Sequence, residues 1–147
     1  MNKLSSTRLG IIVLSLIGLL AACGGNEIEA LPIAPEPDAD GVVRIEIEGV
    51  DRAYDVSSIT VDAGQAIEIK LNNTGWLEHN WVLVAGDVDP LFATEADGIQ
   101  NADSGIIKGG EETTFSFEAP SEPGSYIFVC TVVGHAAEGM WGDFIVQ

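Results

Sequence analysis

The sequence predicts an all-β protein, a β-sandwich of seven or eight short strands, and three observations support this. Between residues 43 and 47, and again between 67 and 71, apolar residues alternate with charged or polar ones. Successive side chains of a strand point to opposite faces of its sheet, so a period of two indicates strands with one buried face. The turn formers Ala63-Gly64, Gly109-Gly110 and Pro123-Gly124 separate such segments at short intervals, as expected of a sandwich.

Two further strands follow from the same pattern. Phe115 and Phe117 flank Ser116, and Tyr126 and Phe128 share one side of a segment that ends at Cys130. The range 87–104 is the exception, because it is polar and lacks a period of two. We expect it to form a long flap with a short helix.

The first 22 residues read as a signal peptide rather than as part of a fold. Lys3 and Arg8 precede an apolar run from Gly10 to Leu20, which is too short to span a bilayer as a stable helix. The run ends in Leu20-Ala21-Ala22-Cys23, which resembles the lipobox of bacterial lipoproteins. That resemblance implies cleavage before Cys23 and lipidation of its sulfur; the alternative is an ordinary signal peptide followed by a chance cysteine.

Residues 23–40 are expected to be a lipid-anchored linker, and residues 41–147 a single domain. The linker contains Pro32, Pro35 and Pro37 among acidic residues, a composition typical of a semi-rigid spacer. The domain is therefore expected to be monomeric, to lie on the extracytoplasmic or periplasmic side, and to be held to a membrane by its N-terminus.

The charge excludes nucleic acid as a partner. The chain has 6 basic and 23 acidic residues and a net charge of −17. Removing Lys3 and Arg8 with the signal leaves 4 basic and 23 acidic residues, a net charge of −19. Such a surface repels phosphate backbones and steers the protein toward basic partners. Solubility alone, or a saline habitat, explains the charge equally well.

One motif carries candidate chemistry. Cys130, His135 and Met140 are spaced as C-x4-H-x4-M between two apolar segments, and His79 opens an earlier one. Two histidines, one cysteine and a long axial methionine are the ligand set of a blue-copper site, which changes little between its two oxidation states and so suits electron transfer. If Cys23 is lipidated, Cys130 is a lone thiol in an oxidising compartment, which is a liability unless it is buried or binds a metal.

Each of these residues has an ordinary explanation when it is taken alone. A free cysteine or a methionine usually fills a core, and a histidine can be an interior or loop residue. The mature chain, however, has only two histidines, one further cysteine and one methionine, and all four fit one pattern. Around them, Asn80 could bridge the two ligand segments through its side-chain amide, with Thr131 as its partner.

At these residues the chain resembles the cupredoxins. The segments that match are 79–84, Tyr126 to Thr131, Gly134-His135 and Gly139-Met140. The spacing is most similar to that of auracyanins, with azurins and plastocyanins as relatives. The resemblance implies an eight-stranded Greek-key sandwich with copper at one end, a buried His79, and a His135 edge that reaches an apolar docking patch.

Two consequences of the resemblance concern the ligand loop. The docking patch would include Val133, Ala136 and Ala137. The family usually has an aromatic residue and a proline where this chain has Val132 and Val133, so the rigidity of the loop needs another source.

The resemblance predicts a one-electron carrier that shuttles between membrane redox complexes or cytochromes, not an enzyme. The alternative is an extracytoplasmic copper carrier or storage protein, although the chain lacks the Met- or His-rich tract that exchangeable copper favours. A copper reductase needs a further metal site with more histidines, and a binuclear centre needs a second loop cysteine; the sequence has neither.

Overall fold

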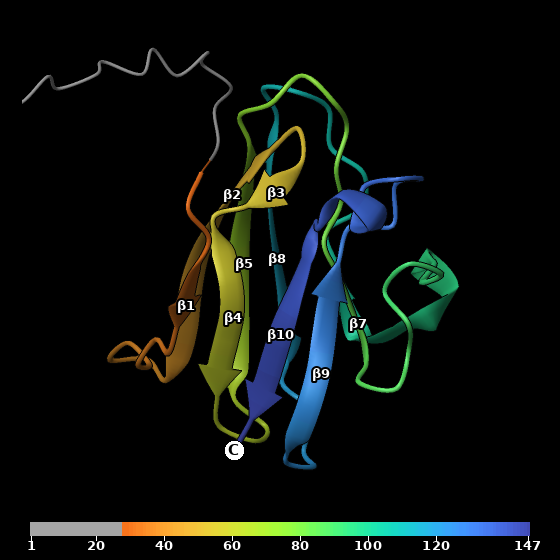
Figure 1. Ribbon diagram of the computed structural model, residues 1–147. Helices are drawn as coiled ribbons and strands as arrows, with labels where there is room; N and C mark the ends of the chain where they lie inside the picture. The colour runs from red at the N-terminus through yellow and green to blue at the C-terminus, as the bar shows by residue number, and fades with distance from the viewer. Residues whose placement is uncertain (1–27) are drawn as a thin grey trace, which may run out of the picture.

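The computed structural model describes residues 28–147, which form two β-sheets packed against each other (Figure 1). The first sheet has six strands in the order β1 (Leu31–Ile33), β4 (Val56–Val61), β10 (Trp141–Val146), β9 (Gly124–Val129), β6 (Val82–Ala85) and β7 (Gly98–Asp103). The second has four, in the order β3 (Ala53–Tyr54), β2 (Val42–Val50), β5 (Ala66–Asn73) and β8 (Glu112–Glu118). The predicted β-sandwich is confirmed, with ten strands in the described residues rather than about eight.

Strand pairing is mixed in both sheets. In the second sheet β2 runs parallel to β5, and β5 runs antiparallel to β8. In the first sheet β10 runs parallel to β4 and antiparallel to β9. Because Trp141 pairs with Val129, the end of β9 and the start of β10 lie at the same end of the sandwich (Figure 1). The loop of residues 130–140 is therefore held at both of its ends.

The core lies between the sheets, and the alternating segments supply it as predicted. Ile47 of β2, Ile69 of β5, Ile59 of β4 and Phe144 of β10 are fully buried. Burying each such side chain contributes roughly 1.5–3 kcal/mol. Trp81 lies in the same core, outside the named strands, and stacks on Phe128 with ring centroids 5.6 Å apart.

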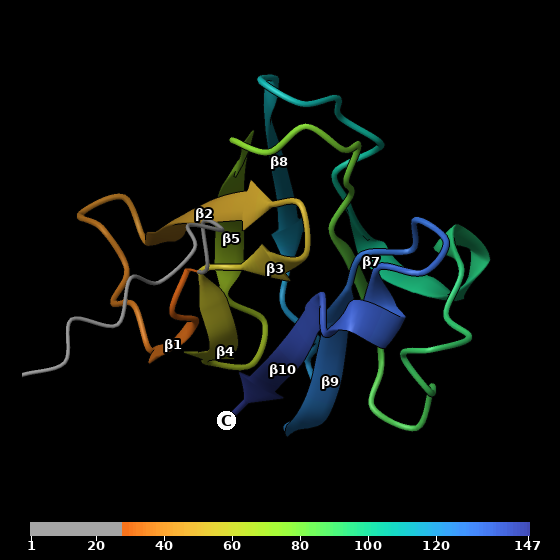
Figure 2. The ribbon, with the colours of Figure 1, turned by 45° about the horizontal axis from the view of Figure 1, so that its top comes forward.

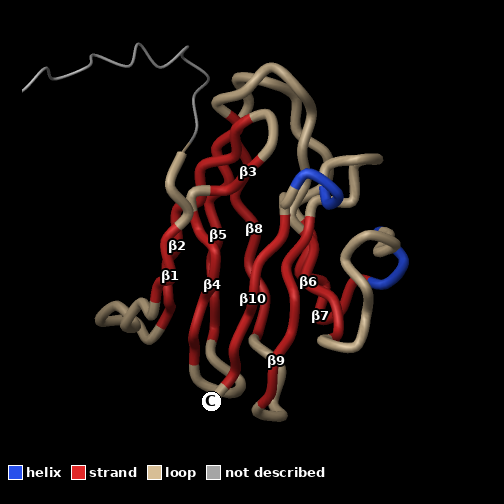
Figure 3. The backbone as a smooth tube through the Cα atoms, viewed as in Figure 1, coloured by secondary structure: helices blue, strands red, loops and turns tan. Residues whose placement is uncertain are grey.

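The flap of residues 87–104 contains the expected short helix, η1 (Glu95–Asp97), and also β7, which the sequence did not predict (Figure 3). β7 is polar because it lies at the edge of its sheet, paired only with β6. Together with η2 (Ala136–Glu138), the flap covers the outer face of β6 and β9 through a small apolar cluster of Val82, Val84, Val129 and Ala136 with Val88 and Ala93. Both faces of β6 are therefore buried, which explains its uninterrupted apolar sequence.

Part of the expected linker belongs to the sandwich. Leu31–Ile33 form β1, which pairs in parallel with β4 along the left side of Figures 1 and 2. Leu31 N–H also donates to the Asp55 carbonyl at 2.8 Å. An edge strand of three residues needs only main-chain pairing, so its proline-rich composition did not reveal it. The signal peptide and Cys23 lie outside the described residues.

No helix of residues 28–147 has the length and apolarity needed to cross a bilayer.

Candidate metal centre

The loop that follows β9 is shaped by its own main chain. Cys130 N–H donates to the Met140 carbonyl, and Met140 N–H donates to the His135 carbonyl, each at 3.0 Å. Gly134 and Gly139 adopt left-handed conformations, with φ of 91° and 99°, which residues with a Cβ rarely adopt. Between them, the single turn η2 brings Met140 back toward Cys130 (Figure 2).

His79 comes from the other side of the sandwich, three residues before β6. It forms an isolated bridge with Ile107, in which His79 N–H donates to the Ile107 carbonyl at 2.9 Å and the reverse bond measures 2.8 Å. These two bonds fix the backbone of His79 independently of its side chain.

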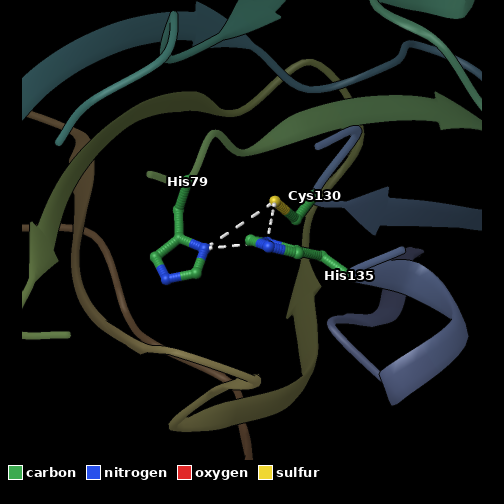
Figure 4. A group of neighbouring side chains, drawn as sticks. All are labelled: His79, Cys130 and His135. Atoms are coloured by element: carbon green, nitrogen blue, oxygen red, sulfur yellow. Dashed lines mark hydrogen bonds between the residues drawn. The ribbon is translucent and has the colours of Figure 1, made fainter. Parts of the chain in front are cut away.

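The structure brings His79, Cys130 and His135 together, as Figure 4 shows. The two Nδ1 atoms lie 3.1 Å apart, and the Cys130 Sγ lies 3.4 Å from His135 Nδ1 and 3.9 Å from His79 Nδ1. His79 and Cys130 are fully buried, and His135 is 7% exposed. Two nitrogens and one sulfur thus converge on one point near the end of the sandwich.

Met140 lies beside this cluster. It is fully buried. A methyl group built on Gly49 of β2 would lie 3.6 Å from Met140 Cε and 3.8 Å from His79 Cδ2. The thioether and the first histidine therefore border the same space above β2.

The cluster is electrostatically neutral when it is empty of charge partners. Burial, and then the neighbouring His135, lower the pKa of His79 to about 4, so this imidazole is unprotonated at neutral pH. Burial raises the pKa of the Cys130 thiol, while the main-chain N–H groups of Asn80 and Val132 donate to its sulfur and oppose that rise. The site therefore presents uncharged nitrogen donors and a sulfur already supplied with hydrogen bonds.

Asn80 connects the two ligand segments, as the sequence suggested. Its Nδ2 donates to Thr131 Oγ1 at 2.8 Å, and Thr131 N–H donates to its Oδ1 at 2.9 Å. The same Nδ2 lies 3.4 Å from Glu95 Oε1 of the flap. His79 and Cys130 are thus held in register by the residues next to them in the sequence.

Sequence reasoning missed two residues of this end of the molecule. Tyr54 of β3 is buried, and its hydroxyl donates to the main-chain carbonyl of Asn80. Asp51, in the turn between β2 and β3, accepts hydrogen bonds from the N–H groups of Leu77 and Trp76, which lower the pKa of its carboxyl. Neither residue has a sequence signal, because both contacts join segments at least 25 residues apart.

An open pocket adjoins His135. Its walls include Trp76, Leu77, Lys108 and Val132. Trp76 is 92% exposed and Val133, in the ligand loop, is 97% exposed. The expected apolar patch is therefore larger on the Trp76 side than the sequence indicated.

The expectation for the alanines of the patch is only half right. Ala137 is exposed, whereas Ala136 is buried against the flap cluster and contributes nothing to the patch.

The donor set fits copper. Nitrogen and thiolate ligands lie about 2.0–2.3 Å from a late first-row metal such as zinc, so trigonal neighbours are about 3.5–3.8 Å apart. The observed separations of 3.1–3.9 Å are close to that range. The cluster of His79, Cys130 and His135 includes no carboxylate, and a set of imidazoles with a thiolate and a thioether favours copper over hard cations such as Mg²⁺ or Ca²⁺.

Comparisons with known proteins agree with this geometry. Residues 42–147 match the family model described as copper binding proteins, plastocyanin/azurin family. Auracyanin-A of Chloroflexus aurantiacus is 33% identical over 140 residues, covering 80% of this chain and 82% of its own. The solved structure of auracyanin A, titled a "blue" copper protein, matches with a TM-score of 0.60 at 32% identity, over 73% of this chain and 100% of that one. Reduced auracyanin from Roseiflexus castenholzii gives 0.58 at 31%, over 71% and 96%.

Proposed function

The chain belongs to the plastocyanin/azurin family of copper-binding proteins and has copper as its cofactor, and from this premise we propose that it carries single electrons between membrane redox complexes. His79, Cys130 and His135 hold the ion, with Met140 as the axial ligand. The bound ion supplies the one-electron change between Cu(II) and Cu(I).

One observation supports this function above the others: the donor atoms are already in place, at 3.1–3.9 Å from one another, with no charge partner to displace. Main-chain bonds fix the Cys130 loop and His79 separately. A site held in this way changes shape little when its charge changes, which favours fast electron exchange over chemistry on a substrate.

The apolar patch around His135 is the proposed exit for the electron. Trp76 and Val133 extend it, and the chain around it carries a net charge of −17. The partner is therefore a redox protein, such as a cytochrome or a membrane complex, with an apolar contact area bordered by basic residues. Opposite charges accelerate such encounters at low salt.

Exchange with a basic redox protein should slow as ionic strength rises. Trp76→Ser should slow it at every ionic strength, whereas Leu31→Ser, at an exposed position on β1, should leave it unchanged. Equal rates for the two variants would contradict the docking proposal.

We also propose that Cys23 is lipidated and holds the protein on the extracytoplasmic side of a membrane. Cys23→Ser should release the protein from the membrane fraction. Retention of that variant in the membrane would contradict the anchor.

The electron-transfer proposal is tested by spectroscopy of the purified, copper-loaded protein. Anaerobic dithionite should bleach an intense visible copper–thiolate band, and an oxidant should restore it over repeated cycles. A copper-loaded protein without that band would end the proposal.

The same sample separates the carrier or storage alternative. Rapid loss of copper to a chelator would favour a carrier, and slow loss together with reversible bleaching favours an electron carrier.

A further inference from the structure

Tyr54 places a hydroxyl group between the two segments that supply the copper ligands. It lies on β3, opposite Gly49 of β2, and is 3% exposed. Its hydroxyl donates to the main-chain carbonyl of Asn80, the residue after His79. Its ring lies 5.8 Å from that of Phe128, on the strand that leads to Cys130. A residue outside the ligand motif therefore contacts both halves of the site.

The hydroxyl also reaches the sulfur. Tyr54 is a hydrogen-bond partner of the Cys130 side chain, in addition to the N–H groups of Asn80 and Val132. Burial, and then the neighbouring Cys130, raise the pKa of Tyr54 well above 10.0. The phenol therefore keeps its proton and remains a donor at any working pH.

We propose that Tyr54 is a positioning residue of the copper site, whose hydroxyl fixes Asn80 and stabilises negative charge on the Cys130 sulfur, so that the centre accepts an electron more readily. This inference rests on the proposed electron-transfer function. Hydrogen bonds around the cysteine sulfur tune the potential of such centres. They hold electron density on the sulfur and reduce its donation to the metal, which favours the reduced state.

Two effects of the hydroxyl act in the same direction. The direct bond to Cys130 stabilises the thiolate. The bond to the Asn80 carbonyl fixes the backbone that aims the Asn80 N–H at the same sulfur. Losing the hydroxyl weakens both donors at once. A purely structural tyrosine would instead contribute only its ring, which packs against Phe128.

Tyr54→Phe tests the proposal, because it keeps the ring and removes only the hydroxyl. The matched control is Tyr126→Phe, which removes a hydroxyl that donates to the Glu122 carbonyl at 3.0 Å, on β9 away from the metal end. In Tyr54→Phe the equilibrium constant for reduction by a mediator of fixed potential should fall roughly 2- to 10-fold, the effect of about one hydrogen bond. The copper–thiolate band should shift.

A measurement on the metal-free protein complements these. The amide resonances of Asn80 and Val132 should move in metal-free Tyr54→Phe and stay at their wild-type positions in Tyr126→Phe. A Tyr54→Phe protein with wild-type potential, band and amide resonances would overturn the proposal, even if its stability had fallen.

If Tyr54→Phe does not fold, the donor is strengthened instead. The chain has two tyrosines, so growth of Tyr126→Phe on 3,5-difluorotyrosine labels residue 54 alone with a more acidic phenol. Reduction should then become more favourable than in unlabelled Tyr126→Phe, and no change overturns the proposal. Failure of electron transfer is distinguishable, because it would show as the absence of a reversible band in the wild-type protein.

Discussion

The hydrogen bonds between Asn80 and Thr131 should contribute more to stability than those of a surface pair, because they join the two ligand segments. Thr131→Val removes only the Nδ2 to Oγ1 bond of 2.8 Å and should cost about 1 kcal/mol. Asn80→Ala also removes the 2.9 Å bond to Thr131 N–H, and leaves that donor, in a half-buried main chain, without its partner. Its cost should be about 2–4 kcal/mol.

Urea unfolding of the metal-free proteins measures both values, since copper would otherwise add its own binding energy. For a domain of this size, about 1 kcal/mol lowers Tm by about 4 °C. Thr74→Val is the matched control, because it removes an exposed side-chain bond to Glu48 of 2.7 Å and should cost less than about 0.5 kcal/mol. The reasoning is refuted if Asn80→Ala costs no more than Thr131→Val, or if the double variant costs the sum of the two.

Three further outcomes are expected. Cys130→Ser should lose the visible band while the far-ultraviolet spectrum of the sandwich persists; unfolding of the metal-free variant would show that Cys130 is needed for folding instead. Met140→Leu conserves volume in a fully buried position, so it should cost less than about 1.5 kcal/mol, keep the colour and raise the potential; loss of all copper would refute the axial role of Met140. Hydrogen bonds from Arg44, and then from Val42, lower the pKa of Asp40 from 3.8 to about 2, so the stability it contributes is complete above about pH 4 and lost as pH falls through about 2. The difference in urea midpoint between wild type and Asp40→Asn should therefore vanish toward pH 2, and a difference that persists there would argue against the ion pair.

The sequence predicted the sandwich because its alternating strands bury one face each. Ile45 and Ile69 face the core while Arg44 and Glu68 face solvent, where they pair with each other at 3.2 Å. The strands it missed are those whose formation depends on main-chain pairing at a sheet edge. β1, β3 and β7 have two to six residues and no apolar period, so nothing in their composition distinguishes them from loops.

The candidate ligands were predictable for a different reason. Their residue types are rare in this chain, and a short loop fixes three of them relative to one another. Tyr54 and Asp51 could not be predicted in this way, because their positions depend on how the β2–β3 turn packs over the segment before β6. Which strands meet at the metal end is a property of sheet order rather than of any local pattern.

The ligand loop also shows how a fold replaces residues that its relatives use for rigidity. Val132 and Val133 stand where an aromatic residue and a proline are usual, yet the loop is fixed by main-chain bonds from His135 to Val132 at 3.1 Å and from Cys130 to Met140 at 3.0 Å. Such bonds do not depend on side-chain identity, so the substitutions leave the donor atoms in place. Because the same loop aims the Val132 N–H at the Cys130 sulfur, its rigidity and the stabilisation of the thiolate have one cause.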